Sequence, residues 1–177
     1  SSDVCSSDLS ANQINAVVPF ELAGRRAVKV SVEAAGYEPA EVADVPVAAT
    51  APGIFSTDGV RAIVLNQDAS LNSPAAPAAI GEIIQIFATG QGVTNPRVET
   101  GAISPAAAPF ATPEAQVALF IGGQPAEILF AGLAPGSAGL LQVNARIPAG
   151  VAPSENLPIL LAIGDAQSAG PRVIAVK

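Results

Sequence analysis

The chain has 177 residues and a net charge of −7, and half of its residues are hydrophobic although only 4% are aromatic. This acidic balance leaves no basic surface for phosphates and argues against nucleic-acid binding. The sequence has no His and a single Cys, Cys5, which excludes Ser-His-Asp and Cys-His catalytic sites and zinc sites built from Cys and His. No apolar run reaches the about 18 residues of a membrane-spanning helix.

Residues 1–9 differ in composition from the rest of the chain and have no apolar period. We interpret them as translated sequencing-adapter sequence or a disordered tail, with a natural polar linker as the alternative. Either interpretation removes them from the fold. Cys5 then carries no information about the redox compartment.

A strand pattern is repeated between the two ends of the chain. Gln13-Ile14-Asn15-Ala16 reappears as Gln142-Val143-Asn144-Ala145, and a proline follows each copy. Apolar residues alternate with polar or small ones, which predicts half-buried β-strands. Each copy is followed by two further predicted strands, at 27–34 and 41–48 in the first copy and at 157–163 and 171–176 in the second. A repeat of this length indicates tandem domains.

The segment between the two copies predicts further strands at residues 60–66, 81–89, 115–121 and 124–131. In the second of these, Ile84, Ile86 and Ala88 share one face, and Gly122-Gly123 predicts a tight primed turn between the last two. Residues 93–113 are rich in Pro and Ala and show no period, so we expect an extended strap packed onto the domain. The predicted fold is an all-β, Ig-like antiparallel β-sandwich over residues 51–177, preceded at 10–50 by the C-terminal half of a second copy whose first half is missing.

Several motifs, taken together, resemble one protein family. They are Pro-Gly-Ile-Phe, Asp-Ala-Ser-Leu-Asn-Ser-Pro, Gly-Glu-Ile-Ile-Gln-Ile-Phe-Ala-Thr-Gly, Ile-Gly-Gly-Gln-Pro-Ala-Glu and Phe-Ala-Gly-Leu-Ala-Pro-Gly, with Leu-Gln-Val-Asn after them. In this order they resemble the uncharacterised Solibacter-type C-terminal domain of acidobacterial exported proteins, over residues 10–177. The Ile-Gly-Gly hairpin is also similar to immunoglobulin-like domains of the transcription-factor type. The resemblance implies a C-terminal position in a longer secreted or surface protein, with no activity to carry over. One departure is Asp68-Ala69, where the family's usual turn is Asp-Gly.

Four oxygen-bearing side chains lie at alternate positions: Asn66, Asp68, Ser70 and Asn72. The spacing is faintly similar to a calcium loop, but the glycine and the bidentate Glu of an EF-hand are missing. We favour a turn in which these side chains bond to local backbone groups.

Two other groups of polar residues receive a structural interpretation. The candidates for an acid–base pair are Glu82, Glu99, Glu114 and Glu127, but solvated strand faces explain them. The segment Gly90-Gln91-Gly92 is interpreted as a strand terminator. Gln142 and Asn144, with Gln13 and Asn15, suggest either a ligand-facing row or side chains bonded to backbone at a sheet edge. We favour the second because both copies keep the pair.

The sequence thus predicts no catalytic residues, no metal site and no cofactor. We expect a non-enzymatic extracellular or cell-surface module that acts as a spacer or C-terminal attachment domain, with neighbouring domains of the same chain as its partners. The alternatives are a carbohydrate- or protein-binding adhesion module that uses residues 93–113, and an accessory domain of a secreted enzyme. The low aromatic content weakens the carbohydrate alternative.

Overall fold

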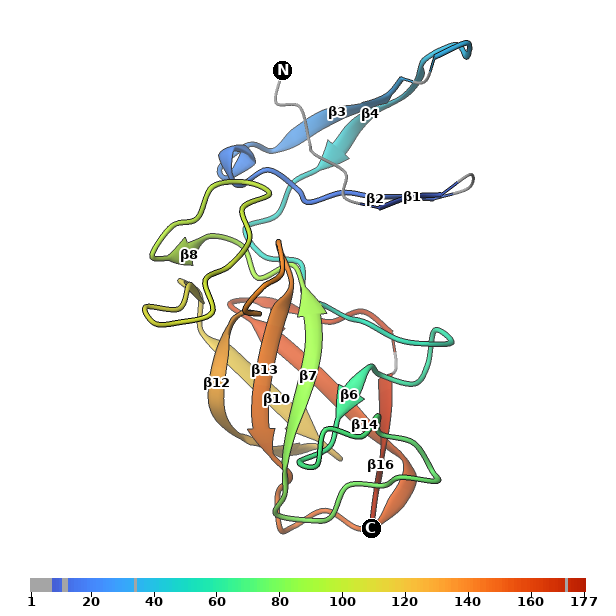
Figure 1. Cartoon of the computed structure of the whole chain (residues 1–177), viewed down its shortest axis with the longest axis vertical. Coiled ribbons are helices and arrows are strands. Elements are labelled where there is room, and N and C mark those ends of the chain that lie inside the picture. The colour runs from blue at the N-terminus through green and yellow to red at the C-terminus, as the bar shows by residue number, and fades with distance from the viewer. Residues whose placement is uncertain (1–7, 11–12, 34, 171) are drawn as a thin grey trace.

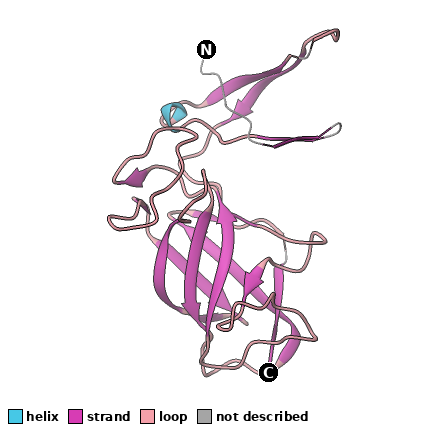
Figure 2. Ribbon diagram, viewed as in Figure 1, coloured by secondary structure: helices cyan, strands magenta, loops and turns pink. Residues whose placement is uncertain are grey.

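The structure is a computed structural model that describes residues 8–10, 13–33, 35–170 and 172–177. Within these ranges it consists of strands and loops, with one 3-10 turn, η1 (Phe20–Leu22). Figure 2 shows this strand-dominated architecture, and every pair of named strands is antiparallel in the described part of the chain. The predicted all-β antiparallel sandwich is therefore confirmed.

The first sheet of the sandwich has β7 and β13 at its centre. Its strands are β5 (Gly53–Ile54), β6 (Val64–Leu65), β7 (Ile83–Thr89), β12 (Glu127–Leu133) and β13 (Leu141–Arg146). The order is β12-β13-β7-β5, and β6 pairs with another stretch of β7. The strand predicted over residues 60–66 is confined to β6, because the turn before it is held by Asp58, whose carboxylate accepts the backbone N–H groups of Val60 and Arg61.

The second sheet is built around the long strand β14. Its strands are β10 (Val117–Ile121), β11 (Gln124–Pro125), β14 (Ser154–Ile163), β15 (Ala166–Gln167) and β16 (Arg172–Val176). One edge of β14 pairs with β10, while β15 and β16 also pair with β14. Figure 1 shows this sheet behind the first one, with the strands of the two sheets crossing at an angle.

An aliphatic core fills the space between the two sheets. Period-2 alternation turns every second side chain of a half-exposed strand inward. Ile84, Ile86 and Ala88 of β7 are each 0% exposed, as predicted from the pattern. They face residues of the second sheet that include Leu119, Ile121, Leu161 and Ile163. The core cluster lies entirely between residues 54 and 176.

The Gly122-Gly123 turn is confirmed, but the hairpin it starts is shorter than predicted. Both glycines have positive φ, 57° and 77°, as a type I′ turn requires. The returning strand pairs with β10 through Gln124 and Pro125, and the Ala126 N–H donates one further bond to the Leu119 carbonyl at 2.9 Å. From Glu127 on, the chain pairs with β13 instead, so it leaves this sheet and enters the other one as β12. The single strand predicted over residues 124–131 is wrong in this respect.

The residues before position 51 form two small two-stranded sheets outside the sandwich. Their strands are β1 (Asp8–Ser10), β2 (Gln13–Asn15), β3 (Ala27–Val32) and β4 (Ala40–Pro46). The three predicted strands are present in β2, β3 and β4 with shorter bounds, and Ala34 lies outside the described residues. Residues 1–7 of the expected tail also lie outside them, whereas Asp8 and Leu9 belong to β1 and pair with β2.

Candidate functional site

The linker between β4 and β5 is held against the end of β7 by close backbone contact. Gly90 and Gly92 have φ of 79° and 73°, and a Cβ on either would overlap the carbonyl oxygen of Ala51 or Ala49. The Ala51 N–H donates to the Gly90 carbonyl at 2.9 Å. The Gly90-Gln91-Gly92 segment does end a strand, as predicted. Its second role was missed, although paired glycines beside a strand signal close approach of another backbone.

A second contact anchors the linker to the other sheet. The Thr50 hydroxyl donates to the carbonyl of Ile163, the last residue of β14, at 2.7 Å. Gly164 follows directly with a φ of 58°. The linker therefore contacts the ends of β7 and β14, one strand from each sheet.

The long loop, residues 93–113, contacts η1. The Phe20 N–H donates to Thr100 Oγ1 at 2.9 Å, and the Thr100 hydroxyl donates to Glu21 Oε2 at 2.7 Å. This hydroxyl lowers the pKa of the Glu21 carboxyl, since a donor favours the charged form. Thr100 thus joins two neighbouring residues of η1 to the loop.

The loop itself is pinned to the sandwich at several points. Its two ends pair as β8 (Thr94–Asn95) and β9 (Thr112–Pro113). Phe110 packs edge-on against Phe130 of β12, with ring centroids 5.6 Å apart and an interplanar angle of 82°. The Ser104 N–H donates to the Ser137 carbonyl at 3.0 Å. These contacts agree with the expected packed-down strap.

A small, partly open cavity of about 140 Å³ lies at the junction. Its lining comes from η1 and the start of the loop: Phe20, Glu21, Ala23, Val93, Thr94, Arg97 and Val98. Ligand pockets of proteins usually measure about 300–1,000 Å³. The cavity is therefore too small for a sugar residue or a drug-sized ligand.

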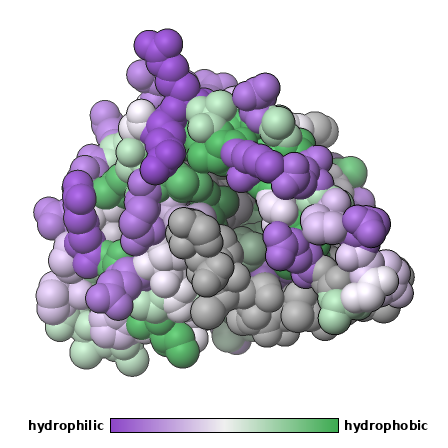
Figure 3. Space-filling model, turned by 90° about the horizontal axis from the view of Figure 1, so that it is seen from above, coloured by the Kyte–Doolittle hydropathy of each residue, from purple (hydrophilic) through white to green (hydrophobic). Residues whose placement is uncertain are grey.

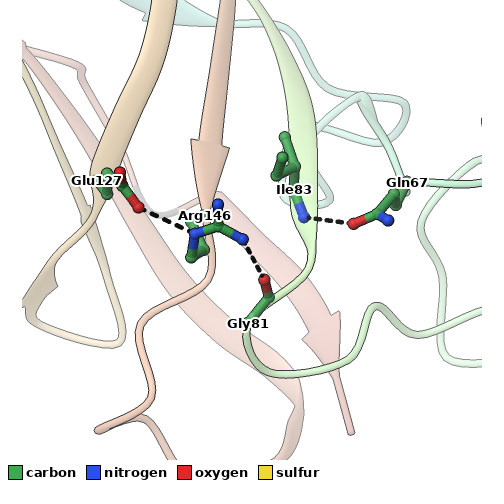
Figure 4. A network of polar contacts seen from close by, with 5 residues as sticks. All are labelled: Gln67, Gly81, Ile83, Glu127 and Arg146. Carbon is green, nitrogen blue, oxygen red and sulfur yellow. Dashed lines mark hydrogen bonds and ion pairs between the residues drawn. The ribbon is translucent and has the colours of Figure 1, made fainter.

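The four candidate glutamates lie in separate places. Glu82 accepts the Ala79 N–H at 2.8 Å, and Glu127 pairs with Arg146 at 2.9 Å. Figure 4 shows that Arg146 also donates to the Gly81 carbonyl, which ties the ends of β7, β12 and β13 together beside the Gln67–Ile83 contact. Glu99 and Glu114 are exposed, in the long loop and just after β9. The described residues thus hold no hydrogen bond or ion pair that links two of these carboxyl groups.

The four alternating oxygens of residues 66–72 bond to the protein itself. Asp68 accepts the N–H and the hydroxyl of Ser70 at 3.0 and 2.6 Å, which lowers the pKa of its carboxyl. Asn72 is 1% exposed and bonds through both amide atoms to the backbone of Ala175, 103 residues away. The favoured turn interpretation describes Asp68 correctly. The long-range role of Asn72 was missed, because nothing near it in the sequence indicates its partner.

Gln142 and Asn144 lie in the middle of a sheet and not at an edge as expected. Their strand, β13, pairs with β12 on one side and β7 on the other. The Gln142 Nε2 atom donates to Asn144 Oδ1 at 2.9 Å, so the pair bonds side chain to side chain. Both are half-buried on the outer face of the sheet. In the first copy, Asn15 is exposed.

No protein-family model, no curated protein and no solved structure matches this chain. Among the described residues, no helix is long and apolar enough to cross a membrane.

Proposed function

We propose that the chain is a non-catalytic, extracellular or cell-surface module that acts as a rigid spacer or C-terminal attachment domain of a larger exported protein. In this proposal residues 51–177 form a complete Ig-like domain, and residues 10–50 are the C-terminal half of a preceding one. Support for the exported context comes from the family resemblance of the sequence. The single observation that carries the spacer role is the fixed junction between the two parts.

Three sets of contacts hold the linker and the residues beside it. Gly90 and Gly92 seat it against β7, Thr50 ties it to β14, and Thr100 ties η1 to the long loop. A flexible tether between domains is typically rich in Gly and Ser and makes few contacts. A junction with defined contacts fixes the direction of one module relative to the next, which is the property a spacer needs.

The non-catalytic part of the proposal rests on the residues the chain has. Hydrolysis at neutral pH needs an activated nucleophile, a tuned acid–base pair or a metal-bound water. Lys29 forms an exposed ion pair with Glu41 at 2.6 Å, and the candidate glutamates lie apart, two of them in local contacts of their own. Reproducible turnover on polysaccharide, peptide or ester substrates, abolished by one Glu→Gln change, would contradict this part.

A distance measurement tests the rigid junction. Spin labels are placed at the exposed positions Glu38 and Asp165 after Cys5→Ser, and their distance distribution is recorded by pulsed electron resonance. We expect a single narrow distribution that broadens in Thr100→Val, because that change removes the two hydrogen bonds that join Thr100 to Phe20 and Glu21 of η1. Thr112→Val is the matched control, since Thr112 lies in the same loop but bonds only within it, to the Asn95 carbonyl. A broad distribution in the unmodified junction would contradict the spacer role.

One observation favours the alternative of a binding module. A shallow hollow of about 620 Å³ lies on the outer face of the second sheet, with mostly apolar residues around it: Phe120, Gly123, Pro158, Ile159, Leu160, Gln167, Ser168 and Gly170. A lone aromatic ring beside aliphatic side chains suits a protein surface better than a sugar. Phe120→Ala tests this alternative, because it should weaken adhesion to a protein-coated surface without shifting the distance distribution of the junction.

A further inference from the structure

The internal repeat extends from the sequence to the pairing of strands. In the complete domain, β14 pairs antiparallel with β16, and the register shifts once, between Ser154 and Leu157. In the preceding half, β3 pairs antiparallel with β4, and the register also shifts once, between Val28 and Val30, although here the extra residue lies in β4 and not in the long strand. The sequence repeat places β3 where β14 lies and β4 where β16 lies. The β3–β4 ladder is therefore the counterpart of the β14–β16 ladder.

The two ladders differ at the other edge of the long strand. In the complete domain this edge of β14 is paired with β10, and Ile121, Leu119 and Val117 stand opposite Ile159, Leu161 and Ile163. Those three β14 residues are 3%, 0% and 0% exposed. Among the described residues, β3 pairs with β4 and with no other named strand.

The apolar residues of β3 are correspondingly uncovered. By the repeat, Val28, Val30 and Val32 occupy the positions of Ile159, Leu161 and Ile163. Val30 and Val32 are 45% and 42% exposed, and Val42 on β4 is 60% exposed. Figure 3 looks down on this half of the molecule and shows green apolar surface between purple polar side chains.

An open strand edge beside exposed valines is a site for pairing with another strand. Natural edge strands are usually protected by charged side chains, proline or a bulge that turns the edge away. On β3 the one charged residue is Lys29, and its ammonium group pairs with Glu41 of β4, inside the existing ladder. The bulge lies on the β4 side as well. The edge of β3 opposite β4 therefore has no proline, no bulge and no unpaired charge to protect it.

We propose that the edge of β3 opposite β4 binds an antiparallel β-strand of alternating aliphatic residues, of the kind that β10 supplies to β14. The strand would come from the chain that precedes this half-domain in the exported protein, so the inference rests on the proposed tandem arrangement. The repeat also fixes the register: the counterparts of Ile121, Leu119 and Val117 stand opposite Val28, Val30 and Val32. Main-chain hydrogen bonds supply the affinity, and the alternating side chains supply the specificity.

A peptide test uses the chain's own β10 sequence as the probe. A synthetic peptide of residues 115–125, AQVALFIGGQP, is added to the full chain, and amide hydrogen exchange is followed by mass spectrometry. We expect saturable protection of residues 27–32 and unchanged exchange in β14, whose edge is already paired. A scrambled peptide of the same composition is the control and should give no protection.

A chain variant separates edge pairing from unspecific adhesion. Val30→Lys puts a charge beside the aliphatic side chains of the incoming strand, and we expect it to weaken peptide binding about tenfold or more. Exchange in β7 monitors the fold of the sandwich and should not change. Equal protection by the scrambled peptide, unchanged binding in Val30→Lys, or dimers of the chain held together through β3 would each overturn the proposal. The two tests have separate readouts: the spin-label distances are recorded without peptide, and protection by the peptide is recorded on the unlabelled chain, so failure of this inference stays distinct from failure of the spacer role.

Discussion

Asn72 provides the sharpest test of how the sandwich is held together. Its Oδ1 accepts the Ala175 N–H at 2.7 Å, and its Nδ2 donates to the Ala175 carbonyl and to Asn66 Oδ1 at 2.8 and 2.9 Å. In Asn72→Ala the Ala175 carbonyl keeps a bond from the Ala78 N–H at 3.1 Å. The Ala175 N–H and Asn66 Oδ1 are left without these partners. A buried group that loses its partner costs about 1–3 kcal/mol, so we expect a loss of about 2–6 kcal/mol in unfolding free energy.

Urea titration of the full chain measures this loss. The matched control is Asn156→Ala, because Asn156 is exposed and its amide oxygen accepts from Arg61 at 2.9 Å. We expect this control to cost less than about 1 kcal/mol. Equal losses in the two variants would refute the reasoning. A calcium-dependent rise in melting temperature that Asn72→Ala abolishes would instead make the 66–72 segment a metal site, since a bound ion stabilises the folded state by mass action.

Three further predictions concern the core, a turn and acid stability. Ile84→Ala should lower the unfolding free energy by about 2–5 kcal/mol, the usual range for a buried aliphatic residue. Gln85→Ala should lower it far less. If denaturant titration gave the reverse ranking, the assignment of inward and outward residues in β7 would be off by one. Ala69 has a φ of 66°, a backbone conformation that is strained for alanine and not for glycine. Ala69→Gly should therefore raise the unfolding free energy by about 0.5–1 kcal/mol, while the control Ala75→Gly, at an ordinary φ, should lower it. A lower unfolding free energy in both variants would contradict backbone strain at Ala69. The N–H groups of Arg61 and Val60 hold the pKa of the Asp58 carboxyl below its usual value. The ionised Asp58 carboxylate stabilises the fold above about pH 4, and this stabilisation is lost as the pH falls through the lowered pKa. In Asp58→Asn the melting temperature should therefore fall less steeply as the pH is lowered below about 4. An unchanged pH dependence of the melting temperature would argue against this role of Asp58.

Period-2 alternation made the faces of the central strands predictable. Ile84, Ile86 and Ala88 turn inward because a strand has only two faces and one of them is covered. The Gly122-Gly123 turn was predictable for an equally local reason, since both of its residues need a positive φ.

What the sequence left undetermined depends on residues that are distant along the chain. The switch from β11 to β12 was missed because the strand pattern continues across it, while the partner strand changes from β10 to β13. The clamp between Asn72 and Ala175 and the docking of the linker against Gly90 involve partners that local patterning does not identify. Local rules therefore predicted the strands and their faces, while the neighbours of each strand had to come from the fold.

The two copies of the repeat separate these contributions within one molecule. Leu161 and Val30 occupy equivalent places in the same alternating pattern, yet Leu161 is fully buried and Val30 is 45% exposed. The difference cannot come from the local pattern, which is shared, so it comes from the neighbours of each strand. The first sheet packs on Leu161 and β10 flanks β14, whereas among the described residues β3 pairs with β4 and with no other named strand. Apolar burial contributes about 25 cal/mol per Å², so the stabilising area lies in residues 51–177. The β3–β4 hairpin alone has little to hold it, since an isolated two-stranded hairpin is only marginally stable. In the arrangement that we propose, a further strand beside β3 and the sheet packed on it would bury the valines of β3, which links the exposed surface of the β3–β4 hairpin to the strand that we propose it binds.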